Sequence, residues 1–544
     1  MADMDFDLTS IQAARELARR GKEAADAIAG YDERRIDRIL RAMVEAAEAH
    51  GEELGAMAVE ETGFGIAEDK AYKNHMASGL LYEQIKDRRT IGIVDVDEER
   101  QVITIAEPVG LVLGIVPSTN PTSTVIYKAM IALKARNAIV FSPHPAAAKC
   151  TALAIRILND AAVAAGAPPN VIQGVELNSM AATDELMHAP EVSLIIATGG
   201  PGMVRAAYSS GKPALGVGAG NSPAYIERSA DVPDAVRRII ASKTFDNGTI
   251  CASEQSVICE TCNRDAVVAE FERQGGYFMT PDECDRVCAL LFRNGHAMSP
   301  RFVGRSALTI ARGAGLSVPE GTKVLIGEQR GVGEEWPLSF EKLTCVLGFY
   351  TVGDWEEACD LSIRLLQNGI GHTMSLHTQD KDMVRRFSVK PASRILVNTG
   401  GSQGGTGLVT GLDLALTLGC GTQGGSSVSE NVGPQHLVNL KRVANGLVEP
   451  DQVVGADELF ARYHPELAAK ARGGAGRAAV EGSVPPGATS CPEPGDRGAA
   501  CRRRAGADRP EPRGAAVYAS DDGGLSAADL QEMVAGLSNA FKGL

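Results

Sequence analysis

One cysteine stands where its thiol could do covalent chemistry. Cys251 follows the Asn-Gly pair at 247–248 and comes shortly before an apolar run, 255–259, that predicts a strand. A thiol is the best side-chain nucleophile near neutral pH, because a few per cent of it is already thiolate and sulfur is intrinsically reactive. The turn ahead of Cys251 would expose backbone N–H groups to a developing oxyanion. Position alone does not decide, because an isolated intracellular cysteine is often only a small buried apolar residue.

The residues from 109 to 202 predict a frame that could position such a nucleophile. Short apolar strands alternate with helices, which is typical of a parallel sheet in an α/β layer. Ligands of such sheets bind beyond the carboxyl ends of the strands. The strands are predicted over 109–116, 138–141, 171–175 and 193–197, and the helices over 124–134 and 146–165. The loops that could carry a site are therefore 117–121, 142–145 and 198–202.

One of these loops has the composition of a phosphate site. Thr198-Gly-Gly-Pro-Gly202 follows a strand and opens a helix, and free N–H groups and the helix dipole suit a phosphate there. No G-x-G-x-x-G follows the first strand, and a glycine-rich turn is as often purely structural. The loop alone is therefore only a candidate.

The spacing of apolar residues differs on either side of this region. Apolar and small residues recur at helical spacing over 11–28 and 36–59, so the first ninety residues are predicted to be helical. The period changes over 90–108, where a two-stranded excursion surrounds an acidic turn. A second α/β region is predicted over 231–402, and an apolar strand or helix over 436–443.

The composition is that of a soluble globular protein with two or three domains. A formal net charge of −14 over 544 residues argues against a nucleic-acid partner. The acidic N-terminus lacks the apolar core of a signal peptide, and no apolar run approaches membrane-spanning length. The eleven cysteines are odd in number and scattered, and Cys259 and Cys262 have no second pair to complete a zinc site. We expect a cytoplasmic protein with free thiols, no metal and no membrane contact.

Taken in order, the motifs resemble those of the aldehyde dehydrogenase superfamily, and more closely its coenzyme A-acylating branch of acetaldehyde and propionaldehyde dehydrogenases. The resemblance covers roughly residues 8 to 447. It is carried by EETGFGIAEDK (60–70), EPVGLVLGIVPSTNPTST (107–124), NAIVFSPHP (137–145), TGGPGMV (198–204), GVGAGNSPAYI (216–226), FDNGTICASEQ (245–255), EKLTCVLGFY (341–350), NGIGHTMSLH (368–377) and GCGTQGGSSVSENVGPQHL (419–437).

The resemblance implies roles for the reacting residues. Cys251 matches the catalytic thiol, and Asn120 matches the side-chain amide of the oxyanion hole, which stabilises the tetrahedral oxygen. Hydrolytic members carry a glutamate that activates water, and Val217 stands at its position here. Valine cannot take a proton, so the resemblance favours transfer of the acyl group to the CoA thiol. His372 could polarise or deprotonate that thiol, or could equally be a structural histidine.

The resemblance also implies a nicotinamide site. Thr198, Gly199 and Gly200 match the pyrophosphate side of the cofactor site, and Glu341 matches the carboxylate that holds the nicotinamide ribose. The adenosine side would lie at Ser142 and Pro143, where other members often have Lys-Pro. The serine leaves NAD versus NADP open, and the same loops could admit the CoA nucleotide.

The end of the chain changes character. Residues 474–524 are rich in Ala, Gly, Pro and Arg without an apolar period, which predicts a disordered linker. A capping-box-like start at Ser526 follows, and then one apolar stripe at helical spacing. The stripe consists of Leu530, Met533, Val534, Leu537, Phe541 and Leu544. This segment, 525–544, resembles the encapsulation peptides that dock enzymes to microcompartment shell proteins, or it could pack on its own catalytic core.

The resemblance therefore implies an α/β protein with the aldehyde dehydrogenase fold. It would oxidise a short-chain aldehyde with NAD(P) and CoA to acyl-CoA, as a homodimer or homotetramer inside a bacterial microcompartment. The expected parts are a cofactor-binding domain over 1–230 with an oligomerisation arm at 90–106, a catalytic domain over 231–405, and a return segment that also serves oligomerisation over 406–447. The alternatives are a hydrolytic aldehyde dehydrogenase that makes free acid and a non-catalytic scaffold.

Overall fold

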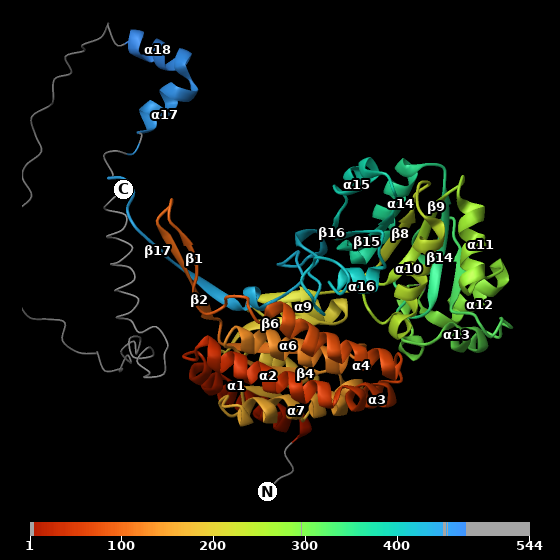
Figure 1. Ribbon diagram of the computed structural model, residues 1–544, viewed down its shortest axis with the longest axis horizontal. Coiled ribbons are helices and arrows are strands. Elements are labelled where there is room, and N and C mark those ends of the chain that lie inside the picture. The colour runs from red at the N-terminus through yellow and green to blue at the C-terminus, as the bar shows by residue number, and fades with distance from the viewer. Residues whose placement is uncertain (1–4, 295, 450–452, 454, 475–544) are drawn as a thin grey trace, which may run out of the picture. The chain divides into compact units, whose positions relative to one another are not determined.

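The computed structural model describes residues 5–294, 296–449, 453 and 455–474 (Figure 1). Their chain divides into two compact units, one of residues 5–94 and 105–441 and the other of residues 95–104 with the described residues after 441. Apart from Gly474, the predicted linker 474–524 and the predicted helix 525–544 lie outside the described residues. None of the helices in the described part has the length and apolar character needed to cross a membrane.

The N-terminal region is helical, as predicted. Asp5 and Asp32 cap the first two helices by accepting hydrogen bonds from Asp7 N and Arg35 N. Gly63, in the left-handed conformation, ends the third. The elements are α1 (Phe6–Ile28), α2 (Glu33–Ala49), α3 (Gly51–Thr62), α4 (Ala67–His75), a π-helical segment η1 (Met76–Leu80) and α5 (Leu81–Ile85).

The first sheet is parallel, with the strand order β5-β4-β3-β6-β7. Its strands are β3 (Leu111–Val116), β4 (Ala138–Pro143), β5 (Ile172–Gly174), β6 (Val192–Thr198) and β7 (Ala214–Val217). The crossover elements are α6 (Pro121–Lys134), η2 (Pro145–Ala147), α7 (Ala148–Ala164), α8 (Met180–His188) and α9 (Pro201–Ser209). Every residue of β3 is buried, which explains its unbroken apolar run. The strand order reverses between β3 and β6, where such sheets open a ligand crevice.

The second sheet has seven parallel strands in the order β10-β13-β14-β9-β8-β15-β16. Figure 1 labels β8, β9, β14, β15 and β16 of this sheet. They are β8 (Ser222–Ile226), β9 (Glu254–Glu260), β10 (Gly276–Phe278), β13 (Val324–Glu328), β14 (Val346–Val352), β15 (Gly371–His377) and β16 (Ala392–Val397). The helices around it are α10 (Val232–Thr244), α11 (Arg264–Gln274), α12 (Pro281–Leu291), α13 (Ala307–Gly313), α14 (Trp355–Leu366), α15 (Lys381–Phe387) and α16 (Gly401–Gly405). The chain passes from the first sheet to the second between Val217, the last residue of β7, and Ser222, the first residue of β8. This point lies before residue 230, where the sequence predicts the end of the cofactor-binding domain.

Smaller elements complete the described chain. The predicted excursion is present as β1 (Gly92–Asp97) and β2 (Val102–Pro108), and the pattern at 436–443 becomes the strand β17 (Val438–Ala444). These three form a separate sheet in the order β1-β2-β17. The remaining elements are η3 (Phe245–Gly248), β11 (Phe292–Arg293), β12 (Ala297–Met298), η4 (Pro300–Phe302), η5 (Pro337–Ser339), η6 (Gln367–Gly369), η7 (Thr422–Gly424), η8 (Pro434–Leu437), α17 (Ala456–Tyr463) and α18 (Pro465–Gly474).

Position 371, the first residue of β15, requires glycine for two reasons, its left-handed backbone conformation and its close packing. Its φ is +82°, and a Cβ atom there would lie 2.0 Å from the carbonyl oxygen of Cys420. Gly211 has a similar φ of +78° but no atom within 4 Å of such a Cβ. We predict that Gly371→Ala lowers the melting temperature by several degrees. Gly211→Ala should show only the cost of the left-handed backbone, about 1–2 kcal/mol. Equal losses in thermal melts of the two variants would contradict this interpretation.

Candidate active site

Cys251 lines a cavity of about 260 Å³ at the crevice of the first sheet. The loop after β3 contributes residues 117–120, the loop after β6 contributes 198–201, and the end of β7 with its following loop contributes 217–219. Residues 249–251 and Glu341 also line the cavity.

The turn before Cys251 has an unusual backbone. Asp246, Asn247 and Gly248 follow one another with φ values of 47°, 52° and 74°, all in the left-handed region. Residues other than glycine adopt the left-handed region at a cost in free energy, so surrounding contacts must hold Asp246 and Asn247 in it. Asn247 Nδ2 donates to the carbonyl of Gly304 at 3.1 Å, and a Cβ at Gly248 would meet the carbonyl oxygen of Thr344 at 3.0 Å. The turn therefore fixes the direction in which the chain reaches Cys251.

The Cys251 thiol contacts a histidine. His372 Nε2 lies 3.2 Å from Cys251 Sγ, and His372 Nδ1 lies 2.8 Å from Thr373 Oγ1. Arg394, paired with Thr373 in the register of β15 and β16, donates from Nε to the same hydroxyl oxygen at 3.1 Å. The Thr373 hydroxyl can accept from Nδ1 or donate to it, so these bonds are compatible with both tautomers of His372. In the tautomer with the proton on Nδ1, Nε2 can accept the thiol proton.

Neither member of this pair carries a charge. Burial lowers the pKa of His372 well below its ordinary value, and the nearby Arg394 lowers it further. Burial, with a smaller contribution from the nearby Glu341, raises the pKa of the Cys251 thiol to about 12. At neutral pH the pair is a thiol beside a neutral imidazole. Attack by the sulfur therefore requires the proton to move to the ring at the same time.

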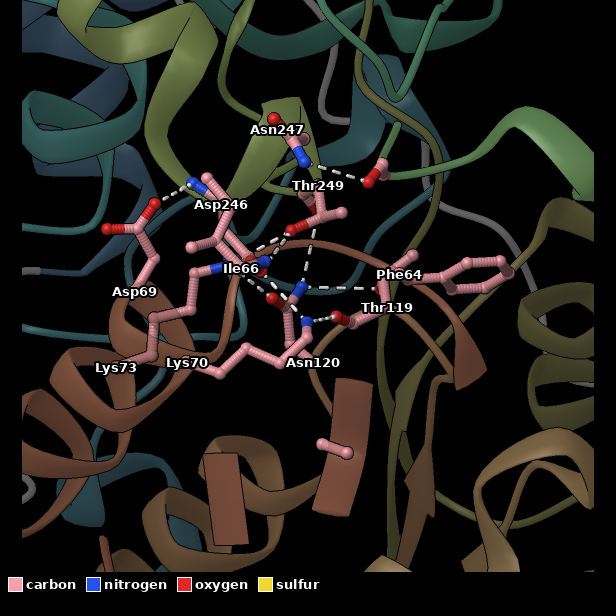
Figure 2. A network of polar contacts seen from close by, with 12 residues as sticks. Phe64, Ile66, Asp69, Lys70, Lys73, Thr119, Asn120, Asp246, Asn247 and Thr249 are labelled. Atoms are coloured by element: carbon pink, nitrogen blue, oxygen red, sulfur yellow. Dashed lines mark hydrogen bonds and ion pairs between the residues drawn. The ribbon is translucent and has the colours of Figure 1, made fainter. Parts of the chain in front are cut away.

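Asn120 stands at the N-terminal cap of α6, directly before Pro121 at the first helical position. Its Nδ2 donates to the carbonyl of Thr249 at 3.2 Å and to Thr119 Oγ1 at 3.3 Å (Figure 2). Its Oδ1 accepts from Lys73 Nζ at 2.6 Å. The carboxamide is thus tied to the segment that leads into Cys251, and its two donor bonds are long.

The glycine-rich loop lies in the same cavity. Thr198, Gly199 and Gly200 line it, and α9 begins directly afterwards with no side chain capping its first turn. A Cβ at Gly200 would meet nothing within 4 Å, so open space lies in front of this helix start. The residues present therefore fit the pyrophosphate of a dinucleotide.

Glu341 also faces the cavity, whereas part of the predicted adenosine side does not. Glu341 Oε1 accepts from Gly220 N at 2.8 Å, and burial raises the pKa of its carboxyl to about 7. The buried hydroxyl of Ser142 bonds to Thr183 Oγ1 at 2.8 Å, and the carbonyl of Pro143 accepts from Asn178. Neither Ser142 nor Pro143 is among the cavity-lining residues; His144, next in the chain, is.

Lys73 and Asp246, two residues that contact the site, were not singled out by the sequence. Lys73 and Lys70 stand one turn apart among acidic residues on α4, a pattern typical of an exposed helix face. Both lysines are buried, because α4 packs against α3, α6 and η3. Asp246 lies within a motif quoted above, but nothing in its spacing indicates a partner 173 residues away.

Comparison with known proteins places the chain in a family. A family model described as aldehyde dehydrogenase family matches residues 5–277. The bifunctional aldehyde-alcohol dehydrogenase AdhE of Escherichia coli K12 is 48% identical over 444 residues, which cover 80% of this chain and 50% of AdhE. The chain thus spans about half the length of such curated relatives.

Solved structures match over nearly the whole of their own chains. An acetylating aldehyde dehydrogenase from Geobacillus thermoglucosidasius has a TM-score of 0.80 and 49% identity, covering 82% of this chain and 99% of that one. A propionaldehyde dehydrogenase from the Clostridium phytofermentans fucose-utilisation microcompartment has a TM-score of 0.72 and 25% identity, covering 79% and 98%. The Rhodopseudomonas palustris propionaldehyde dehydrogenase, with bound CoA and an acylated cysteine, has a TM-score of 0.71 and 26% identity, covering 80% and 97%. The chain belongs to the aldehyde dehydrogenase family.

Proposed function

We propose that this protein oxidises a short-chain aldehyde to its coenzyme A thioester: aldehyde + CoA + NAD(P)⁺ gives acyl-CoA + NAD(P)H + H⁺. The observation that carries the proposal is the contact of 3.2 Å between the Cys251 thiol and the neutral imidazole of His372, at a cavity that Asn120 also lines. The similar Geobacillus protein is called acetylating, and a more distant relative was solved with CoA and an acylated cysteine.

In the first half-reaction Cys251 adds to the aldehyde carbonyl. A C–S bond forms, the thiol proton passes to His372 Nε2, and the carbonyl oxygen becomes a thiohemiacetal oxyanion. Asn120 Nδ2 stabilises that oxygen, exchanging one of its long bonds for a stronger one to a charged acceptor. Thr198, Gly199 and Gly200 would hold the pyrophosphate of the nicotinamide cofactor, and Glu341 would hold the ribose next to the nicotinamide. The cofactor would supply the acceptor for the hydride that the thiohemiacetal loses as it becomes a thioester on Cys251.

In the second half-reaction the thiol of CoA attacks the thioester. After the first half-reaction His372 releases its proton to solvent. It then takes the proton of the CoA thiol, the new C–S bond forms, the bond to Cys251 breaks, and the proton passes to the Cys251 sulfur, which restores the thiol. Val217 is buried at the end of β7 and lines the cavity, and its side chain cannot activate water. The thioester therefore persists until CoA arrives.

We also propose that the sheet of β1, β2 and β17 pairs with a second copy of the chain, giving a homodimer or homotetramer. β1 and β17 are the two edges of this sheet. Leu440 on β17 is 50% exposed, and an open edge strand with an exposed apolar side chain favours pairing with another chain.

We predict that sustained turnover requires CoA. A panel of short-chain aldehydes should give steady NADH formation and an acyl-CoA product only when CoA is present. Cys251→Ala should abolish the reaction, and replacement of the exposed Cys262 should leave it unchanged. Steady production of free acid without CoA would instead make the protein a hydrolytic aldehyde dehydrogenase.

The raised pKa of the Cys251 thiol predicts how its rate of alkylation depends on pH. Because the pKa of Cys251 is raised to about 12, the thiolate fraction should rise about tenfold per pH unit from pH 7 to pH 10. Alkylation by iodoacetamide, followed at the Cys251 peptide by mass spectrometry, should rise in parallel. The exposed Cys262 provides the internal reference. Fast alkylation that is independent of pH between 6 and 8 would indicate a preformed thiolate–imidazolium pair and contradict the prediction.

Finally, we propose that residues 525–544 direct the enzyme to a bacterial microcompartment. Support comes from the apolar stripe in the sequence and from the likeness to a microcompartment propionaldehyde dehydrogenase. Fusion of residues 524–544 to a fluorescent protein should give puncta in cells that make shells. The same fusion with Leu530→Asp and Leu537→Asp, which break the stripe, should be diffuse. Diffuse fluorescence of the unaltered fusion would count against the proposal.

A further inference from the structure

A buried ion cluster lies behind the carboxamide of Asn120 (Figure 2). Lys73 Nζ donates to Asp246 Oδ2 at 2.5 Å, to Asn120 Oδ1 at 2.6 Å and to Thr249 Oγ1 at 3.0 Å. An ammonium has three N–H donors and no acceptor, so these three contacts use all of them. Lys73 and Asp246 are both fully buried.

This environment allows one orientation of the Asn120 side chain. A carboxamide can turn by 180° and exchange its oxygen with its NH₂ group at little change in shape. Lys73 can only donate, so the group facing it must be the oxygen. The carbonyl of Thr249 can only accept, so the group facing it must be the NH₂. In the turned orientation, donor would meet donor at Lys73 and acceptor would meet acceptor at Thr249.

We propose that Lys73 is a positioning residue for the oxyanion site: it binds the Asn120 oxygen so that only the NH₂ group of this side chain is presented toward the carbonyl under attack. The inference rests on the proposed function in taking Asn120 as the oxyanion donor. Without Lys73, the carboxamide could turn its oxygen to the developing negative charge, which would repel it.

Asp246 holds Lys73 in this position. Its carboxylate accepts from Lys73, from Lys70 Nζ at 2.9 Å and from Thr249 Oγ1 at 2.6 Å through Oδ2, and from Ile66 N at 2.7 Å through Oδ1. The two lysines lower the pKa of this carboxyl, so it is ionised. Burial lowers the pKa of Lys73 to about 8, which leaves the ammonium charged at pH 7.

Lys70 provides a matched control. It lies one turn before Lys73 on α4, is equally buried and pairs with the same Asp246 oxygen. Its other acceptor is the carbonyl of Thr119 at 2.8 Å, and its Nζ makes no bond to the Asn120 side chain among the described contacts. Lys70→Met therefore removes a similar buried charge without releasing the Asn120 oxygen.

The test compares two reactions of Cys251 at pH 7. p-Nitrophenyl acetate acetylates the thiol through an oxyanion: the C–S bond forms, p-nitrophenolate leaves, and the thiol proton is lost to the base. Iodoacetamide alkylates the same thiol by displacing iodide, without an oxyanion. The ratio of the two rates, followed by mass spectrometry, therefore measures stabilisation of the oxyanion. Neither reaction needs NAD(P) or CoA, so the test holds even if the protein does not oxidise aldehydes.

We expect Lys73→Met to lower acetylation about 10²-fold, the effect of a small misplacement at a reacting centre, and to change alkylation less than about threefold. Lys70→Met should change the ratio less than about threefold. Asn120→Ala should lower the ratio by about 10²–10³, as for the loss of one oxyanion donor. In the Asn120→Ala background, Lys73→Met should have almost no further effect, because the group that it positions is gone.

Several results would overturn the inference. A parallel fall of both rates in Lys73→Met would show a merely structural role, and so would an unchanged ratio. An Asn120→Ala variant with the wild-type ratio would leave no oxyanion donor for Lys73 to position. If Lys73→Met does not fold, because Asp246 loses a counter-charge, Lys73→Met/Asp246→Asn replaces it and is compared with the wild type. A wild-type ratio of the two rates in this double variant would equally refute the role.

Discussion

The ionised carboxylate of Asp246 is the constraint on which the candidate site depends. A buried charge is stable only when it is paired and hydrogen-bonded, and Asp246 has two lysines, a hydroxyl and a backbone N–H around it. These partners come from α4, from the chain just before it and from the segment before β9. Because one carboxylate binds all of them, the left-handed turn at 246–248 is held in a conformation that its residues would otherwise avoid.

The reacting pair depends on a second constraint, the close approach of backbone segments. A Cβ at Gly220 would lie 2.0 Å from the carbonyl oxygen of Cys251, and Gly371 is packed as closely against Cys420. These contacts fix the backbone at the thiol and beside the imidazole, and partial desolvation in these crowded surroundings keeps both groups uncharged. A surrounding of low polarity thus disfavours the thiolate form of Cys251 before the reaction begins. It also strengthens the hydrogen bond from any donor to a charge that forms during the reaction.

Much of the first sheet could be predicted from the sequence, because buried parallel strands are short continuous apolar runs. The strand expected over 109–116 is β3 (Leu111–Val116), and the helix expected from 124 begins earlier, at Pro121, because proline suits the first helical turn. In the second sheet the run 255–259 was recognised as a strand, whereas most of the other strands were placed only within a broad α/β region. The motif series identifies Cys251, Asn120 and Glu341, and in the structure all three line one cavity. Lys73 could not be predicted, since only tertiary packing distinguishes a buried lysine from an exposed one with the same neighbours.

The sequence separation of the Asp246 partners has a consequence for the order in which the protein acquires structure. Asp246 bonds to Lys73 across 173 residues, whereas Cys251 meets His372 across 121 residues in the other direction along the chain. Contacts at such separations form late, because the loops that they close are long. The turn at 246–248 can therefore reach its final conformation only after α4, which carries Lys73, has packed against it. During synthesis from the N-terminus those helices are available first, and the thiol meets its imidazole only when β15 arrives.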